Sequence, residues 1–325
     1  MVVLSLFDGI SCGQIAFERI GVTFDGVKNK YIASEIKKIA IKTTQLHYPN
    51  TIQVGDVTEL HFDKATNALY SGCKRVDNKC YDITNATKVL DGKPDIIIGG
   101  SPCQNFSTLR VTSGNGNVID GLEGDKSVLF YEYLRLLREI EPKYFLLENI
   151  RMDKQSKAEL DNYLGVNGMM IDSKLVSYQT RARYYWTNIP NIILPKDKHI
   201  SYQNYIDTDT ERCMEATPNR TPSRERMWAD GQSRINTMKA CANLSNHDKI
   251  GCISRKQDRC PNSGMMPYGD WCRFLTRREQ EMAQTLPVGY CDHLSYNQAC
   301  DVIGDGWTVD VIKHILSFIP KEDLR

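Results

Sequence analysis

Short apolar runs alternate with amphipathic stretches along residues 1–190. The apolar runs predict strands buried on both faces, and the amphipathic stretches predict helices between them. We expect strands at Val2–Leu6, Tyr31–Ser34, Thr51–Val54, Asp95–Gly99, Tyr144–Glu148, Ile171–Ser177 and Arg183–Asn188. We expect helices at Gly13–Ile20, Lys37–Leu46, Val128–Ile140 and Lys157–Leu164. This alternation predicts an α/β fold in which helices cover both faces of a largely parallel sheet.

The pattern changes after Pro190. From there to Asp270, Asn, Ser, Thr, Pro and Gly are frequent and periodic runs are few. Helical periodicity returns at Thr276–Leu286 and Val309–Ile319, so the chain is expected to come back to the first domain. The predicted organisation is a catalytic and cofactor-binding domain over 1–189, a smaller irregular lobe over 190–270 and C-terminal return helices over 271–325.

Composition supports a folded chain. Of the 325 residues, 41% are hydrophobic and 25% charged, which fits a globular protein with a sizeable core and excludes a disordered or fibrous chain. The net charge of +1 hides an uneven distribution, because residues 212–278 hold 13 Lys and Arg against 6 Asp and Glu. That balance of +7 leaves −6 for the rest. A basic lobe on an acidic core is typical of a polyanion-binding protein, although an ordinary Arg-rich solvated surface explains the count equally well.

Apolar stretches and cysteines bear on the compartment. The longest apolar stretches, such as Ile96–Ile98 and Tyr144–Leu147, are far shorter than the roughly 18 residues of a membrane span. The first residues predict a strand and not a signal peptide. The 11 cysteines include no Cys-x-x-Cys pair, so neither a disulfide framework nor a metal site is expected. We expect a protein without membrane contact that stays in the reducing, cytoplasmic compartment in which it is made.

Acidic residues follow three successive predicted strands. The first strand runs into the turn Phe7–Asp8–Gly9–Ile10, the second into Glu35 and the third into Asp56, which precedes Val57. At the carboxyl edge of an α/β sheet such residues accept hydrogen bonds from a nucleoside, whereas each one alone is as easily a helix cap. Because the three occur in order, they predict a nucleoside-bearing cofactor. The turn lacks Gly-x-Gly-x-x-Gly, which disfavours a dinucleotide.

Candidate catalytic residues follow the next strands. Cys103, directly after Pro102 in a loop past the fourth strand, is placed as a nucleophile, although most cysteines are buried structural residues. Glu148 ends the next strand and could face the same pocket or cap a helix. Arg181 and Arg183 lie two apart, a spacing that aims both at one face of an extended chain and suits an anion; exposed Arg pairs are usually only solvated.

These residues, in this order, resemble the cytosine-C5 DNA methyltransferase family. Eight motifs follow one another as in that family, namely Phe7–Asp8–Gly9, Glu35, Asp56, Pro102–Cys103–Gln104, Glu148–Asn149, Gln179-x-Arg181-x-Arg183, the stretch from Arg273 to Pro287, and Gly304–Asp305–Gly306–Trp307. Within the family the motifs look most like the animal de novo methyltransferase catalytic domain, in a compact stand-alone form. A bacterial or phage enzyme is equally compatible.

The resemblance implies an S-adenosylmethionine-dependent methyltransferase fold: a Rossmann-like mixed sheet with helices on both faces and a small irregular target-recognition lobe. It implies transfer of a methyl group from S-adenosyl-L-methionine to C5 of a flipped-out cytosine in double-stranded DNA, with S-adenosyl-L-homocysteine as product. Cys103 would add to C6, Glu148 would act at N3, and Arg183 with Arg181 would stabilise negative charge.

The resemblance also assigns contact residues. Those expected to line the cofactor are Phe7, Asp8, Gly9, Ile10, Glu35, Ile36, Asp56, Val57, Pro102, Leu129, Asp305, Gly306 and Trp307. Those expected to contact DNA are Gln104, Asn105, Ser107 and Arg110, within a polar Gly-rich segment interpreted as a lid. Asp305–Gly306 stands where many members have Asn-Ser, and Met282 replaces the usual Arg of its motif. No residue is an obvious base for removing the C5 proton.

Three alternatives remain open. One is a transfer RNA cytosine-C5 methyltransferase of the same fold, although Gln104–Asn105 after the cysteine differs from the Phe-Thr typical of that branch. Another is a catalytically inactive DNA-binding accessory protein, which the presence of Cys103 and Glu148 disfavours. The third is that the donor is a modified S-adenosylmethionine that carries a group other than methyl, suggested by Asp305 at a normally neutral position. The recognition sequence, the oligomeric state (a monomer is compatible) and the role in restriction-modification, phage protection or regulation stay undetermined.

Overall fold

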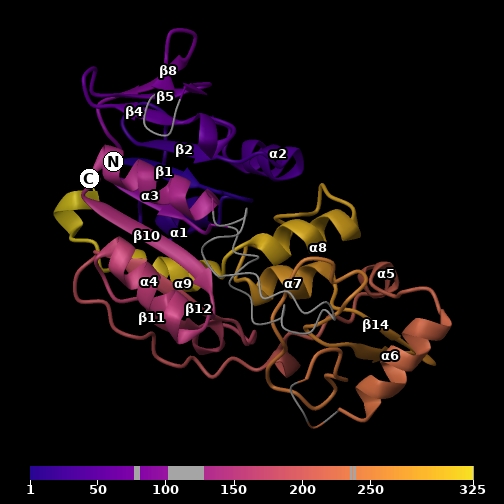
Figure 1. Cartoon of the computed structure of the whole chain (residues 1–325). Helices are drawn as coiled ribbons and strands as arrows, with labels where there is room; N and C mark the ends of the chain where they lie inside the picture. Colours follow the sequence, from indigo (N-terminus) through magenta and orange to yellow (C-terminus); the bar gives the residue numbers. More distant parts are fainter. Residues whose placement is uncertain (77–80, 102–127, 235, 237–238, 325) are drawn as a thin grey trace, which may run out of the picture. The chain divides into compact units, whose positions relative to one another are not determined.

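A computed structural model describes residues 1–76, 81–101, 128–234, 236 and 239–324 of the chain (Figure 1). The chain divides into two compact units. The first unit comprises residues 1–171, 182–192 and 315–325, and the second comprises residues 172–181 and 193–314. The first unit carries a large sheet, whereas the second carries only short elements.

Seven strands form one sheet in the first unit, in the order β11-β12-β10-β9-β1-β2-β3 (Figure 1). Neighbouring strands from β10 to β3 are parallel, whereas β12 is antiparallel to β10. The predicted mixed sheet is therefore confirmed. Its strands are β1 (Val2–Leu6), β2 (Lys30–Ser34), β3 (Ile52–Gln53), β9 (Ile96–Gly99), β10 (Tyr144–Ile150), β11 (Met169–Asp172) and β12 (Ala182–Thr187).

The register brings the carboxyl ends of the parallel strands to one level. Leu6 of β1 pairs with Ser34 of β2 and with Gly99 of β9, and Gly99 also pairs with Leu147 of β10. The next residue on each strand therefore lies at one edge of the sheet, and these residues are Phe7, Glu35, Gly100 and Glu148. Open α/β sheets bind ligands at this edge.

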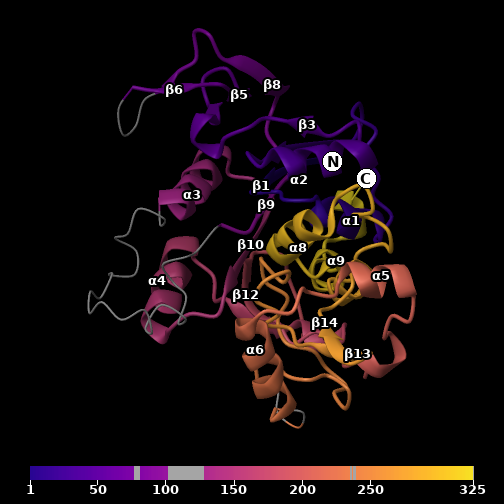
Figure 2. The same cartoon turned by 90° about the vertical axis from the view of Figure 1, so that its right-hand side faces the viewer.

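Helices cover both faces of the sheet, as predicted (Figure 2). Helices α1 (Cys12–Glu18) and α2 (Lys38–His47) lie on one face, and α3 (Val128–Ile140) and α4 (Lys154–Leu164) lie on the other. Helix α3 has the bounds that the sequence predicts, because its apolar residues recur three and four positions apart. Those that join the main core include Phe130, Tyr133, Leu134, Leu137 and Ile140.

Between β3 and β9 the chain forms a small antiparallel sheet that the sequence patterns did not predict. Its strands are β4 (His61–Asp63), β5 (Ala68–Ser71) and β8 (Thr87–Asp91), and β6 (Lys74–Arg75) pairs with β7 (Tyr81–Asp82) beside them. We call residues 61–91 the insertion. Phe62, Leu69 and Leu90 are buried in the main core, but each strand is too short to show a clear two-residue period.

The second unit consists of short helices, a two-stranded sheet and long loops. Its helices are α5 (Thr210–Glu215), α6 (Pro222–Gln232), α7 (Arg277–Ala283), α8 (Tyr296–Asp305) and α9 (Val309–Leu316), of which α9 runs into the first unit at Ile315. Strand β13 (Met266–Tyr268) pairs with β14 (Trp271–Arg273). The described residues also include four 3-10 helices: η1 (Val57–Glu59) and η6 (Lys321–Leu324) in the first unit, and η4 (Ser173–Leu175) and η5 (Tyr202–Asn204) in the second.

Helix α7 belongs to the second unit because of a buried carboxylate. Glu279 forms a fully buried ion pair with Arg273, at 2.7 Å. It also accepts hydrogen bonds from the Tyr202 hydroxyl and the Asp207 backbone N–H, both at 2.9 Å. These contacts fasten α7 to the 202–212 region. The predicted boundary at residue 271 therefore differs from the structure, in which only residues 315–325 of the C-terminal segment belong to the first unit.

Strand β11 ends before the predicted boundary at Ser177. The Asp172 carboxylate accepts hydrogen bonds from the backbone N–H groups of Lys174, at 3.1 Å, and Arg181, at 2.9 Å. The first of these bonds caps η4, so the chain leaves the extended conformation at Asp172. An acidic cap that follows an apolar run is a common way to end an element.

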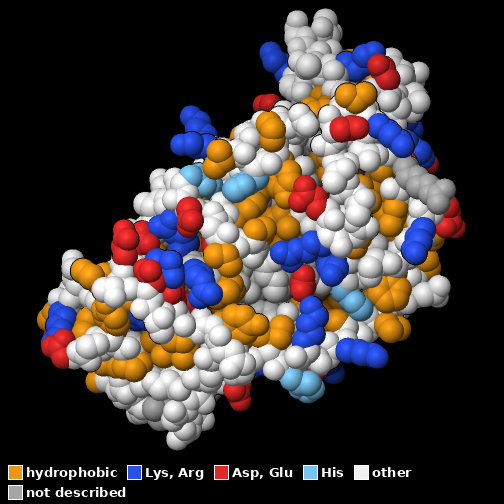
Figure 3. All heavy atoms as spheres, turned by 180° about the vertical axis from the view of Figure 1, so that it is seen from behind, with side chains coloured by type: hydrophobic (Ala, Val, Ile, Leu, Met, Phe, Trp, Pro, Cys, Tyr) orange, Lys and Arg blue, Asp and Glu red, His pale blue; other side chains and the backbone are white. Residues whose placement is uncertain are grey.

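Charges on the surface are mixed. Figure 3 shows Lys and Arg side chains interspersed with Asp and Glu side chains over one face. Part of the excess in residues 212–278 is neutralised, because Arg273 pairs with Glu279 and Arg212 pairs with Asp207, each at 2.7 Å. The balance of +7 therefore overstates the positive surface. No helix in the described part of the chain combines the length and the apolarity that crossing a membrane needs.

Candidate active site

The loop after β1 has an unusual backbone. Phe7, Gly9 and Ser11 all adopt positive φ angles, of 58°, 62° and 57°. Positive φ costs a non-glycine residue energy, so the loop is held by its surroundings and not by local preference. A Cβ atom built on Gly9 would meet no atom within 4 Å. The loop therefore leaves open space at the carboxyl edge of the sheet, while Phe7 packs against the main core and Ile10 is buried.

The Asp8 side chain holds this loop in place through three hydrogen bonds. Its carboxylate accepts hydrogen bonds from the Ser5 hydroxyl at 2.6 Å, from the Tyr31 hydroxyl at 2.8 Å and from the Ser11 hydroxyl. Burial raises the pKa of Asp8 to about 6, although the three hydroxyl groups act in the opposite direction. Asp8 was predicted among the cofactor contacts, and the structure gives both of its oxygens partners within the protein.

Glu35 joins the ends of β1 and β2. Its carboxylate accepts from the backbone N–H of Gly9 at 2.8 Å and from those of Ile36 and Lys37, also at 2.8 Å. Two of these bonds fall on Oε1 and one on Oε2. Since a carboxylate has about four acceptor positions, one remains for a further donor. Ile36 beside it is 71% exposed and presents an apolar side chain to solvent.

Asp56 follows β3 and caps η1 (Val57–Glu59). Its Oδ1 accepts from the backbone N–H and the hydroxyl of Thr58, both at 2.9 Å, and neither bond uses Oδ2. The Ser34 hydroxyl donates to the Gly55 carbonyl at 2.8 Å, which links this turn to the end of β2. Val57 is buried in the main core, and Leu129 of α3 packs against the same core.

Glu148 and Arg183 form an ion pair on neighbouring strands. The distance between Arg183 Nε and Glu148 Oε1 is 3.1 Å, and both side chains are largely buried. Asn149, the next residue, donates to the Ser101 hydroxyl at 3.5 Å, and its own oxygen accepts from the Ile150 N–H at 2.7 Å. Asn149 thus connects the end of β10 with the residue that precedes Pro102.

Arg181 has different partners from Arg183. Its guanidinium group donates to the Ile253 carbonyl at 2.6 Å and to the Gly306 carbonyl at 3.0 Å, all within the second unit. Gly306 also accepts from the Gln284 side chain at 3.0 Å. The predicted common face for the two arginines is not what the contacts indicate, since one binds a carboxylate and the other binds main-chain carbonyls.

Sequence reasoning gave no role to the glutamines that support Arg181. Gln179 and Gln284 are fully buried, and their side chains hydrogen-bond to each other at 3.0 Å. Gln179 also accepts from the Ile253 N–H at 2.8 Å, and Gln284 accepts from the Thr308 hydroxyl at 2.9 Å. Both glutamines stand inside stretches that resemble family motifs, so their position in those motifs was the available signal.

The predicted closing contacts of the cofactor site lie at the end of α8. Gly306 is buried and Trp307 is half-buried. Asp305 is exposed and lies 3.6 Å from Arg255, which is also 3.7 Å from Asp301. Six predicted site residues lie outside the described residues, and these are Pro102, Cys103, Gln104, Asn105, Ser107 and Arg110.

Comparison with known proteins identifies the family of the first unit. Residues 1–166 match the family model described as C-5 cytosine-specific DNA methylase. The orphan methyltransferase M.Rho11sI of Bacillus phage rho11s is 26% identical over 211 residues, which are 61% of this chain and 35% of that protein. DNA (cytosine-5)-methyltransferase DRM2 of Arabidopsis thaliana is 32% identical over 142 residues, which are 43% of this chain and 19% of that protein.

A solved structure agrees in fold. The S. pombe Dnmt2 methyltransferase matches with a TM-score of 0.64 at 13% sequence identity, covering 98% of this chain and 97% of that chain. The matches to the phage and plant relatives span about a third or less of the length of those proteins. The family model, in contrast, covers half of this chain. The chain therefore belongs to the C-5 cytosine-specific DNA methylase family.

Proposed function

We propose that this protein is a DNA (cytosine-5-)-methyltransferase, which transfers a methyl group from S-adenosyl-L-methionine to C5 of a flipped-out cytosine in duplex DNA. The observation that carries the proposal is the Glu148–Arg183 ion pair, which lies at the carboxyl edge of the sheet. Gly9 and Glu35 follow the strands of the same edge. Family membership and the Pro102–Cys103–Gln104 motif supply the rest of the support.

The residues at the carboxyl edge fit a nucleoside-bearing cofactor. The open space at Gly9 admits a ligand close to the backbone. Glu35 retains an acceptor position for a ribose hydroxyl, and Oδ2 of Asp56 can accept from an adenine amino group. The exposed Ile36 side chain offers an apolar surface to the adenine ring. When bound here, S-adenosyl-L-methionine supplies an electrophilic methyl group.

The chemical problem is that cytosine C5 is a poor nucleophile. We assign to Cys103 the addition of its thiolate to C6, which forms the S–C6 bond and makes C5 nucleophilic. After C5 has gained the methyl group, loss of the C5 proton to a base, for which water is our candidate, expels the Cys103 thiolate. Addition at C6 is favoured when N3 carries a proton, so we assign to Glu148 the hydrogen bond at N3.

Arg183 holds this carboxylate in place. Its Nε contact with Glu148 fixes the carboxyl plane, and its positive charge can stabilise the negative charge that develops on the base carbonyl. Arg181 acts differently, because its guanidinium group is used to bind the Ile253 and Gly306 carbonyls. We therefore assign Arg181 to positioning Gly306 and its neighbours Asp305 and Trp307, the proposed closing part of the cofactor site.

Duplex DNA is the proposed partner. A cytosine inside a duplex is out of reach of an enzyme side chain, so the base must be flipped out, at a cost of a few kcal/mol. Gln104, Asn105, Ser107 and Arg110 are the proposed contacts to the opened DNA. The cations of the second unit are proposed to bind phosphates.

The proposal is tested by a covalent trap and by product analysis. We expect wild-type protein and S-adenosylmethionine to form a denaturation-resistant adduct with duplex DNA containing 5-fluorocytosine, because fluorine at C5 blocks the final elimination. We expect Cys103→Ala to abolish both adduct and methyl transfer and to retain DNA binding. Cys260→Ala is the matched control, because Cys260 is an exposed free cysteine and should leave both unchanged.

Two results would overturn the proposal. If Cys103→Ala still forms 5-methylcytosine at more than a trace level, the assigned nucleophile is wrong. If mass spectrometry finds methylation of bulk transfer RNA and none of a duplex DNA pool, the acceptor is wrong. The same spectra identify the group transferred and so test the donor.

A further inference from the structure

Arg135 on α3 connects two parts of the first unit. Its guanidinium group donates from Nη2 to the Leu60 carbonyl at 2.8 Å and to the Val57 carbonyl at 3.4 Å. Val57 begins η1 and Leu60 follows its last residue, so these two bonds hold both ends of that short helix. Two carbonyls held by one planar group fix both the distance and the orientation of η1 relative to α3.

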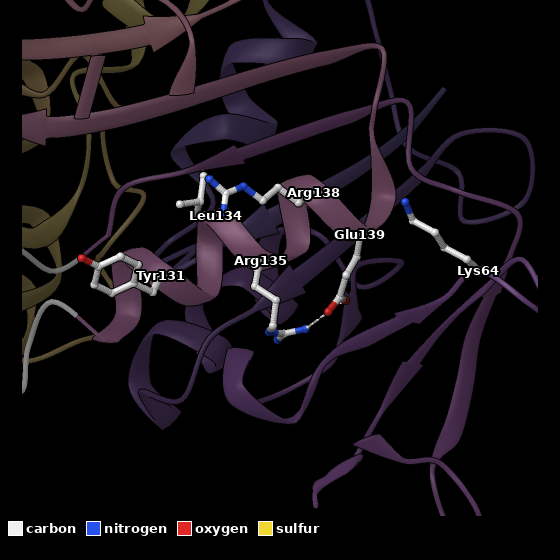
Figure 4. Close-up of a pocket in the computed structure, with 6 residues that line it drawn as sticks. All are labelled: Lys64, Tyr131, Leu134, Arg135, Arg138 and Glu139. Carbon is white, nitrogen blue, oxygen red and sulfur yellow. Dashed lines mark hydrogen bonds and ion pairs between the residues drawn. The ribbon is translucent and has the colours of Figure 1, made fainter. Parts of the chain in front are cut away.

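Two carboxylates on α3 orient this guanidinium group. Glu132 accepts from Nε at 2.8 Å, and Glu139 accepts from Nη1 at 2.8 and 2.9 Å. Although burial raises it, the His61 ring, whose Nδ1 lies 3.3 Å from Glu139 Oε2, and the Arg135 guanidinium group hold the pKa of Glu139 below its ordinary value. Glu139 therefore stays ionised at neutral pH. In Figure 4 Arg135 extends toward Glu139, whereas Arg138 leaves the helix in another direction.

The insertion covers the same guanidinium group. The Tyr81 ring lies 4.7 Å from the Arg135 guanidinium carbon, and the His61 ring stacks on Tyr81 at 4.8 Å. Arg75 of the insertion pairs with Glu132 at 3.0 Å. An arginine whose face and edges are all engaged has little freedom to change its rotamer. The insertion thus fixes the position of Arg135.

The two parts that Arg135 joins are both proposed walls of the cofactor site. Asp56, the N-cap of η1, is the proposed partner of the adenine amino group, and Leu129 in the first turn of α3 is a proposed contact to the cofactor. Arg135 and the insertion can hold Asp56 and Leu129 at a fixed separation without touching the ligand themselves. A shift of η1 away from α3 would move Asp56 and Leu129 apart.

We propose that Arg135 is a positioning residue for the adenine end of the cofactor site, and that the insertion holds it in place. This inference rests on the proposed function. It predicts a specific kinetic pattern. The adenine end is remote from the transferred methyl group, so loosening it weakens the cofactor equally in the ground state and the transition state. The KM for S-adenosylmethionine should rise while kcat at saturation stays nearly constant.

The test compares Arg135→Met and Arg135→Lys with Arg138→Ala. Arg138 is the matched control because it is an exposed cation on the same helix as Arg135. Both side chains line one surface hollow beside α3. Calorimetric titration with S-adenosylhomocysteine, without DNA, gives the dissociation constant, and thermal unfolding gives Tm. We expect Arg135→Met to weaken binding about tenfold, Arg135→Lys to weaken it less, and Arg138→Ala to have no effect.

Tyr81→Leu removes the covering ring but leaves both carbonyl bonds available. It serves as the second variant if Arg135→Met fails to fold, and we expect it to weaken S-adenosylhomocysteine binding by a smaller factor. If both Arg135→Lys and Tyr81→Leu lower Tm but leave S-adenosylhomocysteine binding unchanged, Arg135 has only a structural role and the proposal is overturned. A loss of kcat alone would also overturn it. If the wild-type protein binds no S-adenosylhomocysteine, the proposed function fails before any variant is compared.

Discussion

Residues two positions apart in the sequence can have unrelated roles. The alternation of side chains along an extended chain predicts that Arg181 and Arg183 share a face. The contacts instead pair Arg183 with Glu148 and give Arg181 two backbone carbonyls. Sequence spacing cannot reveal this, because Arg181 precedes β12 and its carbonyl partners come from segments more than 70 residues away.

This division of tasks gives a prediction. Arg183→Ala should lower kcat by about 10²-fold, as expected when one charge-stabilising donor is removed, and it also leaves the largely buried Glu148 without its ion-pair partner. Arg181→Ala removes the short hydrogen bond to the buried Ile253 carbonyl, which costs roughly 1–3 kcal/mol, whereas the Gly306 carbonyl keeps its bond from Gln284. The main effect of Arg181→Ala should be a lower Tm. Steady-state kinetics at saturating DNA gives kcat for each variant, and calorimetric unfolding gives Tm. A full loss of kcat at unchanged Tm in Arg181→Ala would contradict the positioning role of Arg181.

Asp8 gives a prediction about pH. Its pKa is raised by burial to about 6 from 3.8, so the folded protein favours the protonated form. The stability that the protonated Asp8 contributes is therefore fully present below pH about 4 and is lost as pH rises through 6, by about 3 kcal/mol. Asp8→Asn cannot ionise, and the hydroxyl groups of Ser5, Ser11 and Tyr31 can rotate to suit the amide.

Urea unfolding of wild type and Asp8→Asn at pH 4 and pH 8 tests this prediction. The variant should be more stable than wild type at pH 8, by up to about 3 kcal/mol, and equal to it at pH 4. Tyr48→Phe, which removes an exposed hydrogen bond to Glu18 far from this carboxylate in sequence, is the control and should leave the pH dependence unchanged. Parallel pH profiles for wild type and Asp8→Asn would contradict the raised pKa.

At the scale of elements, the sequence predicted the helices and strands that carry many apolar residues in a regular pattern. It did not predict elements that are short or mostly polar. Helix α3 and strands β1 and β9 carry continuous or strongly periodic apolar residues, so their location follows from the sequence. The insertion was not predicted because each of its strands buries at most two apolar residues. Helix α8 was also missed, although Ser295 and Gln298 form a capping box that marks its start.

The buried ion pair between Arg273 and Glu279 of α7 leads to a prediction about stability. Arg273→Met removes the partner of Glu279, whose carboxylate also accepts from the Thr276 N–H at 2.7 Å. An unpaired buried charge typically costs 3–5 kcal/mol, so the second unit should unfold at much lower temperature. The control is Arg255→Ala, because its ion pairs are long and exposed and should contribute about 0–1 kcal/mol. Hydrogen exchange of α7 amides reports the effect, and equal protection in both variants contradicts it.

At the scale of the whole molecule, the sequence predicted a change of organisation at residue 190, whereas the long segment of the second unit runs from Ile193 to His314, past the predicted limit at 271. The first unit follows the predicted alternation of strands and helices, and its strand ends supply the candidate site. The second unit takes its limits from buried polar contacts, such as those of Gln179, Gln284 and Glu279, which link segments distant in the sequence. A count of charges or apolar residues contains no information on such pairings.

The charge of the second unit leads to a prediction about DNA. Arg226 on α6 is exposed, and in the described part of the chain no carboxylate lies within ion-pair distance of it. If Arg226 binds a phosphate, removing this cation makes the negative slope of the log binding constant against log salt concentration shallower by about 0.9. Arg226→Ala should therefore weaken binding uniformly across DNA sequences and reduce that slope by about 1, without changing S-adenosylhomocysteine binding.

Arg138→Ala is the matched control for this measurement. Because α3 follows β9, its C-terminal end, where Arg138 lies, is at the opposite edge of the sheet from the candidate site. Fluorescence anisotropy of a labelled duplex between about 50 and 200 mM salt gives the slope. If Arg138→Ala changes it as much as Arg226→Ala does, or if neither changes it, the basic composition of residues 212–278 reflects a solvated surface and DNA must be held by other residues.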